Sequence, residues 1–264
     1  MIAFRTTENP PTTYNVLQKL LEWRDNTIRL IVPAIVVQEA IRHIDKIFNE
    51  IEIRFGDIEN TLKKGCWINL NEADAAEFKD DVNNIAEKLK KYQSKLKAER
   101  NNYKEVLTKK IMAIIEHQHT IKIATNDMLL SNVYKRQIYK RCPFDRKTSA
   151  LADALTIESL VNIKEFIPAL SDSDKVYFIT RNTSDFSEPG ENKEIMHKHI
   201  VSDLQDRGLN EIVAYRTQFY QMIKNDFSLE VNETNLRGLN LESEIEMEFA
   251  RQDGEAERLG DLER

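Results

Sequence analysis

The string KVYFITRNTSDF at residues 175–186 decides the fold of this chain. Its first half is short, rich in β-branched and aromatic residues, and preceded by the turn-forming residues DSD, which predicts a buried strand over 175–180. Its second half is polar and carries Asp185. The string therefore predicts a strand whose carboxyl end leads into a loop with an acidic side chain.

Helices and further strands are predicted on both sides of this string. Residues 148–166 place apolar side chains almost all round a helix, so we expect that helix to be largely buried. Residues 27–32 (TIRLIV) predict another strand, and Pro33 suits the first turn of a helix whose apolar stripe over 35–51 would cover a sheet. A helix over 14–23 precedes that strand.

The C-terminal side follows the same alternation. A helix around 193–205 with a stop at Gly208 leads to a strand at 212–215. Strands separated by helices pair in parallel, which predicts an α/β fold with an open sheet covered on both faces. Because three strands are few for such a sheet, we expect a further weak or missing strand, and we expect ligands beyond the carboxyl ends of the strands.

Two segments stand apart from this alternation. Residues 72–118 are almost free of Gly and Pro and predict long amphipathic helices, either one arm or a hairpin, inserted at 72–120 within a domain spanning 1–227. Residues 228–264 form an acidic tail, helical or disordered, with eleven acidic and four basic residues. The net charge of -6 comes from this tail, whereas residues 88–147 hold sixteen basic and five acidic residues and predict a phosphate-binding surface.

Export and membrane insertion are not expected from the sequence. There is no apolar run long enough to cross a bilayer and no basic segment followed by an apolar one at the N-terminus. Cys66 and Cys142 fit neither a disulfide framework nor a paired zinc spacing, and the pairs His117/His119 and His197/His199 are spaced wrongly to share a helix face. We expect a cytoplasmic protein with reduced thiols.

Three acidic residues occupy positions where a solvated charge is not expected. Glu39 lies on the apolar face of the helix after 27–32, Asp153 lies in the most apolar helix, and Asp185 follows the strand at 175–180. A cluster of such carboxylates repels itself unless a cation neutralises it, and oxygen ligands favour Mg²⁺ or Mn²⁺. This pattern predicts metal-assisted phosphodiester hydrolysis. The alternatives are an ion pair of Glu39 with Arg42 or His43, a salt bridge of Asp153, and a helix cap by Asp185.

Three strings together resemble the successive motifs of PIN-domain nucleases. These are IRLIVPAIVVQEAIRH, KRCPFDRKTSALADALTIESL and VYFITRNTSDF, and the resemblance is nearest to larger bacterial members with a helical insertion. It implies a PIN-like α/β/α sandwich with a central parallel sheet, Mg²⁺ or Mn²⁺, and usually RNA as substrate. It also matches Glu39, Asp153 and Asp185 to the second, third and fourth acidic positions, and Asn182 to a polar position near the site.

The first acidic position of the family has no match. Family members open with a strand ending in an aspartate, and this sequence has no aspartate before Asp25. We therefore expect that the printed chain begins one strand late, and the alternative is a natural variant in which Glu8 is a poor substitute. The activity of the printed chain depends on which of these holds.

Basic residues near the predicted site are candidates for contacts with phosphate. Arg141, Arg146 and Lys147 precede the Asp153 helix and Arg181 follows the strand at 175–180, although all four could instead balance the carboxylates. The leading hypothesis is a metal-dependent endoribonuclease that acts on RNA or single-stranded DNA. The alternatives are a catalytically impaired nucleic-acid-binding or regulatory protein, and a helical module that forms a homo-oligomer or binds a protein partner through residues 72–120.

Overall fold

The computed structural model describes residue 21 and residues 28–65, 72–147, 149–190, 192–219, 222 and 226. The chain divides into two compact units: unit 1 contains residues 1–28 and 123–264, and unit 2 contains residues 29–122. Most of the helix expected over 14–23, the position of Glu8 and the acidic tail lie outside the described residues.

The sheet of unit 1 contains two strands among the described residues, and the first comes from the string at 175–186. Strand β3 (Val176–Ile179) pairs in parallel with β4 (Val213–Arg216), with Val176 opposite Val213 and Ile179 opposite Arg216. Both strands were predicted within a few residues of these bounds. The parallel pairing confirms the prediction made from the helices between them and places the Asp185 loop after the carboxyl end of β3.

The helices of unit 1 are α4 (Asp127–Ile138), α5 (Leu151–Val161), α6 (Ile163–Phe166), α7 (Thr183–Phe186) and α8 (Lys198–Asp206). The helix predicted over 148–166 is present but divided into α5 and α6 at Asn162, whose side chain donates to the backbone and carboxylate oxygens of Glu158. Helix α8 begins later than predicted, where His197 accepts a hydrogen bond from the His199 amide, and Gly208 follows it with φ of +64°.

Aromatic packing joins β3, β4 and the Asp185 loop. The Phe178 ring contacts those of Phe186 and Tyr215 at centroid distances of 5.2 and 5.9 Å. The Tyr215 hydroxyl and the hydroxyl of the fully buried Ser187 are 2.8 Å apart. These contacts fix the end of α7 against β3 and β4, so the sheet supports the backbone around Asp185.

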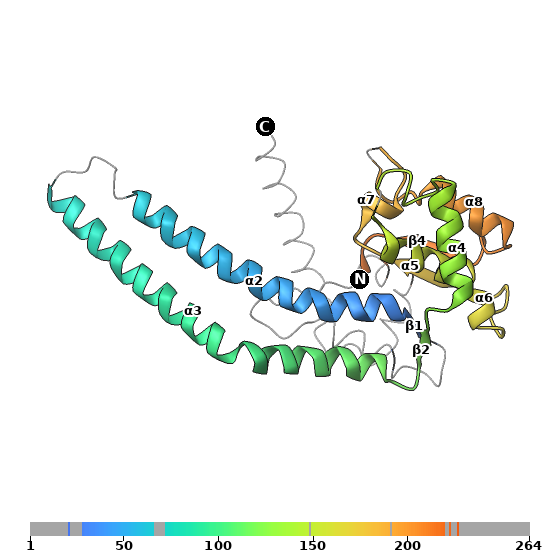
Figure 1. The fold of residues 1–264 in the computed structure, drawn as a ribbon, viewed down its shortest axis with the longest axis horizontal. Coiled ribbons are helices and arrows are strands. Elements are labelled where there is room, and N and C mark those ends of the chain that lie inside the picture. Colours follow the sequence, from blue (N-terminus) through green and yellow to red (C-terminus); the bar gives the residue numbers. More distant parts are fainter. Residues whose placement is uncertain are drawn as a thin grey trace. The chain divides into compact units, whose positions relative to one another are not determined.

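Unit 2 consists of β1 (Leu30–Pro33), α2 (Ala34–Gly65), α3 (Glu72–Ile115) and β2 (Thr120–Ile123), whose last residue is assigned to unit 1. Strand β1 pairs with β2, and α2 and α3 run side by side (Figure 1). Ion pairs join Asp45 to Lys104 at 2.6 Å and Glu59 to Lys90 at 3.5 Å, so the two helices are antiparallel.

The main partner of the helix predicted over 35–51 is another helix. It is 32 residues long and packs mainly along α3, while its predicted cover of a sheet stays a prediction. Its buried residues include Ile44 and Phe48, and the Phe48 ring stacks on Tyr103 with centroids 6.5 Å apart. The arm at 72–118 is therefore one helix, and its hairpin partner is the helix before it.

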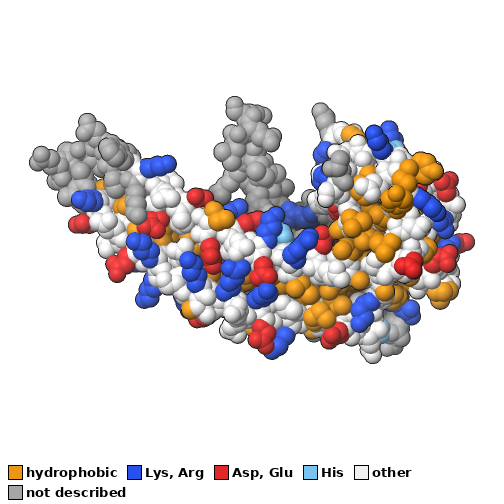
Figure 2. Space-filling view, in the orientation of Figure 1, with side chains coloured by type: hydrophobic (Ala, Val, Ile, Leu, Met, Phe, Trp, Pro, Cys, Tyr) orange, Lys and Arg blue, Asp and Glu red, His pale blue; other side chains and the backbone are white. Residues whose placement is uncertain are grey.

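The charge of this helical pair is more mixed than the sequence count of α3 suggests. Acidic residues of α2 pair with basic residues of α3, and Arg100 contacts both Asp45 and Glu52. Figure 2 shows Lys and Arg side chains interspersed with Asp and Glu over the pair. Part of the basic stretch predicted to bind phosphate is thus neutralised by its neighbour.

Two separate two-stranded sheets are present among the described residues, one in each unit. The chain is α/β, as expected, while the single central parallel sheet stays a prediction. None of the described helices combines the length and the apolarity of a membrane span.

Candidate active site

Asn182 joins two of the predicted acidic residues. Its Nδ2 donates to Oδ1 of Asp153 at 3.1 Å and to Oδ2 of Asp185 at 2.8 Å. Its Oδ1 accepts from the Ser184 hydroxyl at 2.8 Å, which fixes the amide with its nitrogen toward the carboxylates. The carboxylates of α5 and α7, distant in sequence, therefore lie within two hydrogen-bond lengths of each other.

Asp185 is the most buried member of this group. Its exposed fraction is 3%, whereas Asp153, in the first turn of α5, is half-buried. The Lys147 ammonium lies 2.7 Å from Oδ2 and 2.6 Å from Oδ1 of Asp185, but Oδ1 receives no hydrogen bond from the described residues. The pair thus combines a charge contact to both oxygens with a directed hydrogen bond to one.

The loop at 141–147, which carries Lys147, is tied to α7 by other contacts. Arg146 donates to the carbonyl oxygens of Ser184 at 2.8 Å and Ser187 at 3.2 Å. The Cys142 thiol donates to the Asp185 carbonyl at 3.0 Å. These bonds hold the loop beside the acidic group at residues that precede Lys147 in the chain.

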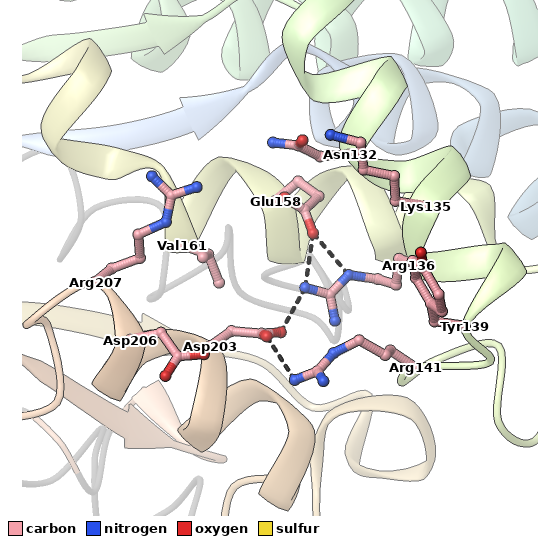
Figure 3. Close-up of a pocket in the computed structure, with 10 residues that line it drawn as sticks. All are labelled: Asn132, Lys135, Arg136, Tyr139, Arg141, Glu158, Val161, Asp203, Asp206 and Arg207. Carbon is pink, nitrogen blue, oxygen red and sulfur yellow. Dashed lines mark hydrogen bonds and ion pairs between the residues drawn. The ribbon is translucent and has the colours of Figure 1, made fainter.

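Arg141 belongs to a different cluster in unit 1. Its Nη2 is 2.6 Å from Asp203, which also binds the buried Arg136 at 2.6 Å, and Arg136 in turn bonds Glu158 at 2.8 Å (Figure 3). This ion network forms part of the wall of a pocket of about 260 Å³. Because the carboxylates are paired with guanidinium groups, the network is a structural junction rather than a second acidic site.

Glu39 and Arg181 complete the predicted set. Glu39 belongs to α2 in unit 2, and its Oε1 accepts from Arg42 at 3.2 Å, which is the ion pair considered as its alternative. Its convergence with Asp153 and Asp185 stays a prediction. Arg181 is exposed and has no hydrogen bond or ion pair among the described residues, unlike Arg141, Arg146 and Lys147.

Cys142, Asp145 and His197 form a second group whose ligand-type atoms all lie within 4.8 Å of one another. His197 Nδ1 accepts from the His199 amide at 3.1 Å, so Nε2 of the neutral ring carries the proton and donates to Asp145 at 3.1 Å. Burial lowers the pKa of His197, and burial together with Asp145 raises the pKa of the Cys142 thiol to about 12. The residue types could hold a metal, but these bonds favour a protonated structural cluster.

The parallel strands and the helices around them define an α/β protein, and the Asp153 and Asp185 carboxylates lie beyond the end of β3. A family model of the PIN domain matches residues 7–186, which is more than half of the chain. The chain belongs to the PIN-domain family. No curated protein and no solved structure gives a match. PIN domains are generally metal-dependent nucleases that bind nucleic acids, mostly RNA.

Sequence reasoning missed contacts that depend on distant segments. The Lys147–Asp185 pair spans 38 residues, and Arg136 reaches Asp203 across 67 residues. One signal was available: Glu158 is a charged residue in the same apolar helix as Asp153, and the same reasoning required a partner for it.

Proposed function

We propose that this chain is a metal-dependent nuclease that hydrolyses RNA internally, with Asp153 and Asp185 as the core of its metal site. The observation that carries the proposal is the Asn182 amide that donates to both carboxylates. This arrangement brings together acidic side chains from two helices in a chain of the PIN-domain family. Single-stranded DNA is the alternative substrate.

The residues fit a hard divalent cation. Asp185 offers a buried oxygen that receives no directed hydrogen bond, although the Lys147 ammonium lies 2.6 Å from it. Asp153 and Asp185 offer only oxygen ligands, which suits Mg²⁺ or Mn²⁺ better than softer metals. Glu39 is the third proposed ligand. A bound cation of this kind lowers the pKa of its water and stabilises charge on a phosphate oxygen.

The chain's own residues have separate tasks in this proposal. Asn182 orients both carboxylates, so their negative charge is directed to one place. Arg181 is exposed after the end of β3 and has no hydrogen bond or ion pair among the described residues, so it is available for the phosphate backbone. Arg141 and Arg146, which we predicted to contact nucleic acid, would have to leave protein acceptors to do so.

Binding of Mn²⁺ and cleavage test the proposal separately. Mn²⁺ binding is followed by the loss of the free-ion electron paramagnetic resonance signal, and cleavage by gel analysis of end-labelled single-stranded RNA and DNA. Asp153→Asn and Asp185→Asn should each weaken Mn²⁺ binding and abolish metal-dependent cleavage. Asp172→Asn is the matched control, because Asp172 is an exposed residue paired only with Lys164 among the described residues.

The outcomes separate the proposal from its main rival. Wild-type affinity for Mn²⁺ in both Asp variants would overturn the metal site. RNA binding without cleavage, in protein that binds Mn²⁺, would favour the catalytically impaired binding protein. That rival is supported by the Lys147 ammonium, which already balances the charge of Asp185.

A further inference from the structure

The Lys147 ammonium contacts the Asp185 carboxylate at the place where a bound cation would lie. Its Nζ lies 2.6 and 2.7 Å from the two oxygens of one carboxylate. The carboxylate belongs to a side chain with an exposed fraction of 3%, while the Lys147 side chain is 47% exposed. The acidic partner is therefore fixed and buried, and the basic partner reaches it from the solvent side.

The two partners differ in how firmly they are held. Asp185 is fixed by the Asn182 amide and, through its carbonyl, by the Cys142 thiol. The Lys147 ammonium has no partner besides Asp185 among the described residues. A flexible four-carbon stem lets the ammonium leave while the loop stays bound through Arg146.

We propose that Lys147 is a built-in competitor for the cation at Asp185, so that a metal ion binds this carboxylate only when the ammonium departs. The inference rests on the proposed function, because it concerns the same metal site. Two cations cannot share the same pair of oxygens without strong repulsion. Metal binding and release of Lys147 are therefore one coupled event, which sets the cation concentration at which the site is loaded.

A permanent counter-ion is the competing explanation. In that case Lys147 stays on Asp185 whether or not Asp153 and the rest of the group bind a cation. Removal of a positive charge near a cation site strengthens binding under either explanation, so affinity alone does not separate them. The accessibility of the Lys147 amine does, because only displacement exposes it.

The amine is probed in the wild-type full chain by brief acetylation followed by peptide mass spectrometry, with and without Mn²⁺. We expect saturating Mn²⁺ to increase labelling of Lys147 about fivefold, the factor for breaking an ion pair of ordinary strength. Lys164 is the matched internal control, because it also pairs with one aspartate and is 42% exposed. Its labelling should not change with Mn²⁺.

Variants add an affinity measurement. Lys147→Met should tighten Mn²⁺ binding by about fivefold, and Lys164→Met, which removes the same charge elsewhere in unit 1, should change it much less. Asp185→Asn should make Lys147 reactive without Mn²⁺ and remove the dependence on the metal.

Each result has one meaning. If Mn²⁺ binds to the wild type and Lys147 labelling does not rise, the competitor role is overturned and the proposed nuclease stands. If Mn²⁺ binds only to Lys147→Met, the ammonium does not depart in the wild type, so Lys147 is a permanent counter-ion and the coupled exchange is overturned. If neither protein binds Mn²⁺, the metal site and the competitor role are both wrong.

Discussion

The Asn182 side chain has one amide nitrogen, and that nitrogen donates to two carboxylates. Both of its protons are used in this way, and its oxygen is used by Ser184. At the scale of single residues, Asn182 is a positioning residue: it directs two acidic side chains without itself being required as a ligand.

Replacement of Asn182 by Ala tests this positioning. We expect Mn²⁺ affinity to fall by about 10- to 100-fold, the usual effect of removing a group that orients metal ligands. The measurement is the electron paramagnetic resonance titration, with Asn210→Ala as a control because Asn210 is exposed and bonds only the neighbouring Glu211 among the described residues. Equal affinities for Asn182→Ala and the wild type would mean that the carboxylates orient themselves.

His197 is a second residue whose bonds specify its protonation state. Its ring is buried, caps α8 through Nδ1 and donates to Asp145 through Nε2. Burial lowers its pKa below the usual value, with Asp145 and Glu188 opposing this shift and Arg146 and His199 adding to it. The neutral ring is therefore the form that fits the folded protein.

The pH dependence of stability follows from the lowered pKa of His197. As pH falls below about 6.5, an unfolded His gains a proton while folded His197 stays neutral, so the free energy of unfolding falls until the lowered folded pKa is passed. His197→Asn keeps a side chain that can cap α8 but does not titrate. Urea unfolding across this pH range should show a weaker dependence in the variant, and an identical slope would contradict the assignment of a buried neutral ring.

At the scale of elements, Arg136 connects three helices of unit 1. It projects from α4, bonds Glu158 of α5 and Asp203 of α8, and donates to the Cys142 carbonyl. Arg136 and Glu158 have exposed fractions of 4% and 6%. A buried guanidinium with this many acceptors fixes the mutual orientation of the helices that carry Asp153 and His197.

Loss of this guanidinium should be costly. Arg136→Met leaves two acidic side chains at the junction without their main counter-ion, and we expect a loss of about 3–5 kcal/mol in the free energy of unfolding. Chemical denaturation is the measurement. Arg207→Met is the control, because Arg207 lines the same pocket but is exposed, and its effect should be within about 0.5 kcal/mol. If Arg136→Met lowered the free energy of unfolding by as little as Arg207→Met, the network would contribute little to stability.

Elements with strong local patterns were predictable, and those that depend on distant partners were not. The strands near 176 and 213 and the apolar helix near 151 carry their patterns within a few residues. Strand β2 and helix α4 were missed: β2 is four residues long with one buried side chain, and α4 has only a narrow buried stripe. The pairing of α2 with α3 could not be read from either helix alone, because each shows only that it has a partner.

At the scale of the whole molecule, Asp153 and Asp185 belong to unit 1, whereas α3 belongs to unit 2. Asp153 and Asp185 could be singled out from the sequence because each carboxylate stands in an apolar or strand-end context. Lys147 could not be assigned to Asp185, since a basic residue near a phosphate-binding site and one that balances a carboxylate look alike in sequence. The net charge of residues 88–147 likewise did not reveal which lysines are paired with α2.

The unpaired lysines of α3 are the part of the basic stretch expected to contact nucleic acid. Lys88, Lys91 and Lys95 are exposed at helical spacing and have no ion pair among the described residues, whereas Lys90 pairs with Glu59. Changing these three to Glu should weaken RNA binding and reduce the slope of log affinity against log salt by about two. Reversal of Lys46, Lys109 and Lys164 is the control for total charge, and equal slopes in both triple variants would mean that this face of α3 is only solvated.

Glu39 provides the test of whether unit 2 supplies part of the metal site. Glu39 pairs with Arg42 at 3.2 Å, and the Glu39 side chain is 35% exposed. Exposed ion pairs of this kind contribute little to stability. If Glu39 is a ligand, Glu39→Gln should weaken Mn²⁺ binding by at least about tenfold while the free energy of unfolding stays near that of the wild type. Glu50→Gln is the matched control on the same helix, where Glu50 pairs with Lys46 at 3.7 Å. Unchanged Mn²⁺ affinity in Glu39→Gln would leave Glu39 as the partner of Arg42 alone and confine the metal site to the carboxylates of unit 1.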